Sequence, residues 1–159
     1  MTPCMTTHNT QRPLLFAYDG SDQAQAAIRE AAAQLRTFGR ALVITVWQPP
    51  AELPFASGAG LPSDIEESME REAMKVAQEG AALARSVGFH ATAVVKSGFP
   101  VWSGIVQAAD EHDAGLIVIG SHGRTGLARA LMGSVATAVS SHSDRPVLIV
   151  HAASADRAA

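Results

Sequence analysis

Four glycines and two arginines are concentrated between residues 119 and 135, together with Ser134, in the segment I-G-S-H-G-R-T-G-L-A-R-A-L-M-G-S-V. Glycine lets the backbone approach a ligand closely. If Gly133 and Ser134 open a helix, the first N–H groups of that helix have no acceptor within it, and they add to the positive end of its dipole. A phosphate group fits such a helix start. Arg124 and Arg129 supply further charged donors.

A second interpretation of this segment is that the glycines only shape a tight turn between a strand and a helix. The neighbouring arginines and the serine favour phosphate binding over this alternative. The segment contains neither the Gly-Lys-Ser/Thr of a Walker A loop nor the G-x-G-x-x-G dinucleotide fingerprint. Its chemistry is therefore expected to differ from both.

The elements that must position this loop alternate along the chain. Apolar runs predict strands at 13–18, 41–47, 90–96, 115–119 and 146–150, and helical spacing predicts helices at 21–38, 63–87, 100–112 and 134–141. Ser21 or Asp22 is expected to cap the first helix and Gly39 to end it, whereas Ser63 and Glu66 form a capping-box pattern. The alternation predicts an α/β sandwich with a parallel sheet, in which ligands bind outside the carboxyl ends of the strands, where the strand order reverses.

Composition sets the class of protein. The chain has 159 residues, 47% of them hydrophobic and 17% charged, which suits one folded domain and excludes a disordered chain. Its net charge of −3 argues against nucleic-acid binding, and its apolar runs are too short to cross a membrane. The single cysteine, Cys4, cannot form an internal disulfide. We expect a cytoplasmic protein with a loose leader (1–11), one domain (12–152), a flap (48–63) and a frayed tail (153–159).

The spacing Gly120-x2-Gly123-x9-Gly133-Ser134 resembles the nucleotide-binding motif of the universal stress protein family, in its ATP-binding branch. Segments 17–21, 98–100 and 145–150 are also similar to the family, so that the resemblance spans residues 13–151. It implies a single α/β domain of the nucleotide-binding, Rossmann-like kind. Its five parallel strands would follow the order 3-2-1-4-5, with helices on both faces of the sheet. The resemblance also implies a homodimer.

The resemblance further implies which residues contact the nucleoside part of an adenine nucleotide. Asp19 matches the acidic residue near the adenosine, and Ala17 matches a residue that lines the base. Val46 matches a residue whose backbone meets the adenine edge, and Ile119 one that packs against the nucleoside. With the strand order 3-2-1-4-5, Asp19 and Gly120 are expected to face each other across the crevice.

A second group is implied on the ribose and phosphate side. Its members are Gly120, His122, Gly123, Gly133, Ser134 and Val135, and Arg124 stands in the same loop. Ala136 departs from the family pattern, which often has a hydroxyl residue there. Because a carboxylate does not face a triphosphate without a cation, Asp19 is assigned to the nucleoside, and Mg²⁺ is a candidate ion at the phosphates.

Other chemistries are less well supported. Asp19 lacks the partners of a phospho-acceptor, a lone loop histidine such as His122 is more often a hydrogen-bonding residue than a base, and Ser134 has no recognisable His-Asp partner. Adjacent residues 111–113 (Glu-His-Asp) do not converge on one metal ion, and both tryptophans are expected to serve in packing. We assign no catalytic and no metal-ligating residue.

The leading hypothesis is an ATP-binding stress-response or signalling module that hydrolyses ATP slowly at most and acts on an unidentified protein partner. The alternative is a nucleotide-free structural or interaction dimer of the same fold. A nucleotidyl transferase is a third class, but its S-G-G-x-D-S and H-x-G-H patterns are absent. The segment 146–151 contains an uncharged apolar edge strand, which is expected to pair antiparallel in the homodimer, so that a charge at Leu148 should give monomers.

Overall fold

The computed structural model describes residues 12–35, 39–49, 62–123 and 132–152. The strands are β1 (Leu14–Ala17), β2 (Arg40–Trp47), β3 (His90–Ser97), β4 (Leu116–Gly120) and β5 (Val147–Val150). The helices are α1 (Asp22–Gln34), α2 (Ser63–Ser86), α3 (Val101–Glu111) and α4 (Ser134–His142). The expected leader and tail lie outside the described residues, as does most of the expected flap.

All five strands pair in parallel in the order β3-β2-β1-β4-β5, which confirms the predicted topology. The chain leaves β1 toward β2 on one side and returns on the other side to form β4. The order therefore reverses at β1, and the carboxyl ends of β1 and β4 are adjacent. This is the position where open α/β sheets bind ligands.

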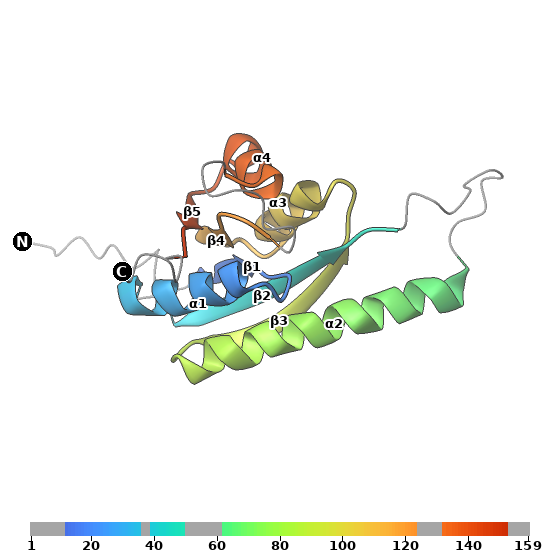
Figure 1. Cartoon of the computed structure of the whole chain (residues 1–159), viewed down its shortest axis with the longest axis horizontal. Helices are drawn as coiled ribbons and strands as arrows, with labels where there is room; N and C mark the ends of the chain where they lie inside the picture. The colour runs from blue at the N-terminus through green and yellow to red at the C-terminus, as the bar shows by residue number, and fades with distance from the viewer. Residues whose placement is uncertain (1–11, 36–38, 50–61, 124–131, 153–159) are drawn as a thin grey trace, which may run out of the picture.

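Helices cover both faces of the sheet (Figure 1), so the strands are apolar on both sides. Leu14 and Phe16 point into the core beneath α1 and α2, whereas Leu15 points into the core beneath α3 and α4. The approach of α2 is close: a Cβ on Gly80 would lie 2.7 Å from the Tyr18 ring. None of the described helices is long and apolar enough to span a membrane.

Two of the expected helix boundaries are wrong. Ser21 caps α1 as expected, since its Oγ accepts a hydrogen bond from the Ala24 N–H at 3.2 Å. The helix nevertheless ends at Gln34, and Gly39 instead leads into β2, where its C=O accepts from His90. The capping box at Ser63 does not form, because Ser63 is already helical and Pro62 occupies the N-cap without a side-chain bond.

The carboxyl ends of α2 and α3 share one backbone motif. Gly88 follows α2 with φ +110°, and the next N–H, that of Phe89, returns to the Ala84 carbonyl at 3.0 Å. Asp113 takes the equivalent place after α3 with φ +48°, and Ala114 N–H returns to the Ala109 carbonyl. The left-handed conformation of Asp113 brings its carboxylate to the amino edge of the sheet, just before β4.

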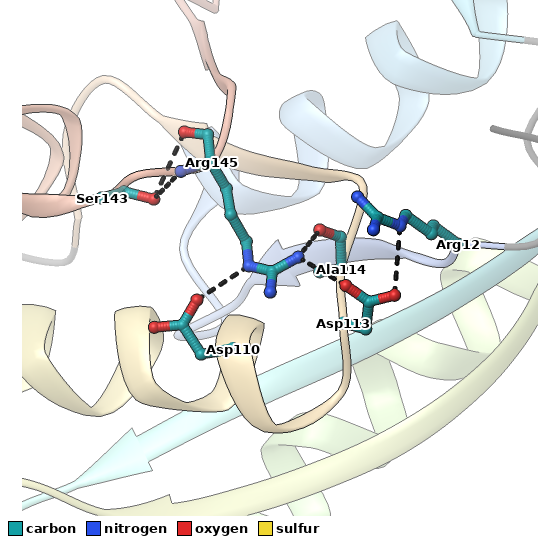
Figure 2. A network of polar contacts seen from close by, with 6 residues as sticks. All are labelled: Arg12, Asp110, Asp113, Ala114, Ser143 and Arg145. Carbon is teal, nitrogen blue, oxygen red and sulfur yellow. Dashed lines mark hydrogen bonds and ion pairs between the residues drawn. The ribbon is translucent and has the colours of Figure 1, made fainter. Parts of the chain in front are cut away.

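At that edge lies a cluster of four charged residues, Arg12, Asp110, Asp113 and Arg145, which we call the amino-edge cluster (Figure 2). Arg145 lies just before β5 and contacts Asp110 at 2.8 Å and Asp113 at 3.1 Å. Arg12 lies before β1 and contacts the other Asp113 oxygen at 3.1 Å. The cluster thus ties the entries of β1, β4 and β5 to the end of α3.

Candidate functional site

The turn after β1 presents Asp19 at the carboxyl edge of the sheet. The Ser21 N–H donates to Asp19 Oδ1 at 3.0 Å, and Gly20 between them has φ +81°, a conformation that glycine adopts without strain. Both backbone polar groups of the preceding residue, Tyr18, are hydrogen-bonded to β2. Its N–H donates to the Ile44 carbonyl, and its C=O accepts from Thr45 Oγ1, both at 2.9 Å. The carboxylate is therefore fixed relative to β2.

The backbone of Val46 faces the crevice. Along a strand, alternate residues direct their N–H and C=O groups to opposite sides. The Ile44 carbonyl accepts from Tyr18 on the β1 side, and the Trp47 carbonyl accepts from Gly98 on the β3 side. Val46 therefore faces the β1 side, past the last β1–β2 residue pair. A backbone N–H and a C=O are therefore directed toward the space beyond the end of β1.

Ser121 organises the loop after β4. Its N–H donates to the Val150 carbonyl at 2.9 Å, and its own carbonyl accepts from the Gly133 N–H at 2.7 Å. Its hydroxyl lies 3.1 Å from His122 Nδ1, and the residue is only 2% exposed. Sequence reasoning did not single out Ser121, although a polar residue directly after a buried strand was an available signal.

The start of α4 has the geometry of an anion site. Gly133 is the N-cap residue, and its C=O accepts the first helical hydrogen bond, from Thr137 N–H at 3.0 Å. By helix geometry, the N–H groups of residues 134–136 have no acceptor within α4. Ser134 is exposed there, while Val135 is half-buried and packs against the core beneath α3 and α4.

The carboxylate of Asp19 lies against Gly123, where a Cβ would be 2.7 Å from Oδ2. We expected it to face Gly120 instead. The Cβ position of Gly120 faces Gln23 of α1, with the Gln23 backbone 3.0 Å away, because α1 packs directly over the end of β4. The predicted partners across the crevice are therefore displaced by three residues along the loop.

The remaining predicted residues contribute unequally. Ala17 is half-buried at the end of β1, but the Ile119 side chain is only 6% exposed and lies within the core beneath α3 and α4. Ile119 thus offers a ligand little surface. Arg124 lies outside the described residues. The assignment of these residues to a ligand stays a prediction.

Electrostatics at this edge involve Tyr18. Burial raises the pKa of its phenol above the ordinary value, and the nearby carboxylates of Glu79 and Asp19 act in the same direction, whereas Arg29 opposes them. The described residues include no group of three histidine, cysteine or acidic side chains that could hold a metal ion.

The residues that were weighed for other chemistries, at 111–113 and at Trp102, contact other parts of the fold. Glu111 bonds Lys96 at 2.6 Å, and Asp113 belongs to the amino-edge cluster. Trp102 stacks on His142, as a packing residue would. The carboxylates at 111 and 113 thus neutralise cations on different elements.

Comparison with known proteins identifies the family of this chain. The sequence profile described as the universal stress protein family matches residues 11–151. A universal stress protein of Methanocaldococcus jannaschii, MJ0531, is 30% identical over 145 residues, which cover 89% of this chain and 83% of that protein. The solved structure of hypothetical protein MJ0577 is 25% identical, with a TM-score of 0.74, and covers 91% of this chain and 98% of that one.

Two further solved structures contain nucleotides. The universal stress protein from Archaeoglobus fulgidus in complex with dAMP is 28% identical, with a TM-score of 0.60, over 87% of this chain and 96% of that one. A universal stress protein in complex with cAMP is 26% identical, with a TM-score of 0.63, over 89% and 98% of the two chains. By its profile match, its sequence relatives and its fold, the chain belongs to the universal stress protein family.

Proposed function

We propose that the protein is an adenine-nucleotide-binding module for stress response or signalling, with ATP as its leading ligand. The observation that carries this proposal is the approach of Asp19 to Gly123, where a Cβ would lie 2.7 Å from the carboxylate. It brings a hydrogen-bond acceptor for ribose against a glycine loop that leads to a helix start. The two relatives with dAMP and cAMP support the adenine part of the proposal.

The nucleoside is assigned to the β1 and β2 side of the crevice. The N–H and C=O of Val46 would pair with the adenine edge, Ala17 would line the base, and the Asp19 carboxylate would accept from a ribose hydroxyl. Ile119 would contribute only its small exposed fraction.

The phosphates are assigned to Gly123 and the start of α4. Amide N–H groups at residues 134–136 and the Ser134 hydroxyl would donate to phosphate oxygens. Gly120 ends β4, His122 follows in the loop after it, and Arg124 would add charge. Mg²⁺, if it accompanies ATP, would be held by phosphate oxygens together with water.

We assign no catalytic residue, and we expect ATP turnover to be slow at most. Asp19 accepts the Ser21 N–H and belongs to the nucleoside side, so it is not placed to activate a water at the γ-phosphate. His122 engages Ser121 through Nδ1.

The same proposal includes a homodimer through residues 146–151. The carbonyls of Pro146 and Val150 accept from Ile117 of β4 and from Ser121 just after it, so the N–H groups of Val147 and Ile149 face the free edge of the sheet. An apolar edge with outward N–H groups pairs readily with a second copy. If the crevice binds no nucleotide, this dimer is the alternative function, a scaffold for an unidentified protein partner.

Titration calorimetry with ATP, adenosine and GTP tests the nucleotide assignment. Asp19→Asn is the informative variant. Its amide oxygen can still accept the Ser21 N–H and keep the turn, whereas the negative charge that faces the ribose hydroxyl is lost. We expect adenosine and ATP to bind the wild type and GTP to bind poorly, and both adenine ligands to weaken by about five- to tenfold in the variant. Absence of heat with every ligand, in protein shown by native mass spectrometry to be ligand-free, would leave the scaffold function.

A further inference from the structure

A ring stack joins α3 to α4 on the face of the sheet that they share. The Trp102 indole in the first turn of α3 and the His142 imidazole at the end of α4 have ring centroids 4.2 Å apart and planes inclined by 24°. The imidazole is also oriented from within its own helix, because His142 Nδ1–H donates to the Ala138 carbonyl at 2.8 Å. The stack therefore connects a fixed ring on α4 to the neighbouring helix.

The rest of α4 is lightly anchored. The helix has 9 residues, of which only Ala136 and Val139 are buried, and both are small. Its start is held through the hydrogen bond from Gly133 to Ser121. A rod of this length, about 13 Å, is thus restrained at its N-cap Gly133, at the small side chains of Val135, Ala136 and Val139, and at the His142 ring.

We infer that the Trp102–His142 stack is a positioning element that directs the first N–H groups of α4 at the phosphates of the bound nucleotide. This inference rests on the proposed function. Both rings act through the helix, since His142 lies eight residues beyond Ser134 at the opposite end of α4. Loss of the stack would let α4 tilt about the Gly133 anchor and misalign its donors.

The inference predicts a selective defect. The nucleoside contacts are assigned to the Val46 backbone and to Asp19, on β2 and in the turn after β1, and neither element contributes a ring to the stack. Adenosine affinity should therefore be insensitive to the stack, whereas ATP affinity should depend on it. A general loss of packing would weaken both ligands together.

The test measures the affinities of ATP and adenosine by calorimetry in three variants. His142→Ala removes the ring, His142→Phe keeps an aromatic ring for Trp102, and Ser140→Ala is the control. The Ser140 hydroxyl is exposed and bonds only within α4, to the Thr137 carbonyl at 2.8 Å. We expect His142→Ala to weaken ATP about five- to tenfold with adenosine unchanged. His142→Phe and Ser140→Ala should stay within about twofold of the wild type.

Hydrogen exchange provides a second readout without ligand. In His142→Ala, the amides of α4 should exchange faster while those of α3 and β4 do not. Equal ATP affinity in wild type and His142→Ala, or an equal loss for both ligands, would overturn the inference and leave the proposed function intact. A wild type that binds neither ligand would overturn both.

Discussion

The Gly133 N–H donates to the Ser121 carbonyl at 2.7 Å, and this bond seats the start of α4 directly on the loop that follows β4. Ser121 is at the same time bonded to Val150 at the end of β5. One buried residue thus holds the loop, the helix start and the last strand in a single arrangement. The candidate phosphate site is defined by backbone contacts, and it is sensitive to any side chain added at Gly133.

Gly133→Asp should abolish ATP binding. A Cβ at this position would lie 2.9 Å from the Ser121 carbonyl, and the carboxylate would add a negative charge beside the phosphates. We expect a loss of at least about 100-fold, since like charges some 4 Å apart near a protein surface repel by several kcal/mol. Calorimetry with ATP measures it.

Gly133→Ala separates the two causes, because it adds the Cβ without the charge. Its affinity should fall between those of the wild type and Gly133→Asp. ATP binding by Gly133→Asp at wild-type strength would contradict the assignment of phosphates to α4.

Much of the fold could be predicted because each element carries its own signal. Apolar runs such as 115–119 are buried on both faces and end at polar or glycine residues. The signal for the start of α4, Gly133 followed by Ser134, was equally local. The helix boundaries expected at Gly39 and Ser63 were wrong, since α1 already ends at Gln34 and Pro62 takes the N-cap of α2.

The contacts across the crevice could not be predicted from local pattern. That Asp19 meets Gly123 and not Gly120 depends on how α1 packs over β4, where the Gln23 backbone already fills the space beside Gly120. The role of Ser121 likewise arises from bonds to residues that lie 12 and 29 positions away, Gly133 and Val150.

Ile149→Pro should convert a dimer to a monomer. The Ile149 N–H faces the free edge of β5, so proline removes a donor for a second copy without removing a bond to β4. Light scattering gives the mass in solution. The side chains of Leu148 and Ile149 both pack against the core, on opposite faces of the sheet, so a charge at Leu148 would also disturb the fold.

Ile149→Ala is the matched control for this experiment, since it shortens the side chain and leaves the N–H. It should remain dimeric. A dimeric mass for folded Ile149→Pro would argue that the copies associate through another surface, as would a wild type that is already monomeric.

Tyr18 should make stability fall at alkaline pH. Burial raises the pKa of its phenol above 10.0, so the unfolded chain loses this proton first. The contribution to the free energy of unfolding is complete below pH 10.0 and is lost as pH rises through the folded pKa. Tyr18 is the single tyrosine, so phenolate absorbance reports its titration directly. The free energy of unfolding, measured with urea, should decline less between about pH 9 and pH 11 in Tyr18→Phe than in the wild type. Parallel declines in the two proteins would contradict this prediction.

Arg145→Ala should lower the free energy of unfolding by about 1–2 kcal/mol, because Arg145 bonds Asp110, Asp113 and the Ala114 carbonyl at once (Figure 2). The hydrogen bond to Asp110 raises the pKa of Arg145, so the guanidinium stays charged and the loss should be the same at pH 7 and pH 9. Arg145→Lys should recover little, since an ammonium cannot span both carboxylates as a planar fork does.

Arg12→Ala is the control: its ion pair with Asp113 joins two exposed side chains, and its removal should cost less than about 0.5 kcal/mol. Urea unfolding of the three variants measures these differences, and equal losses for Arg12→Ala and Arg145→Ala would show that Arg145 does not join the entry of β5 to the end of α3.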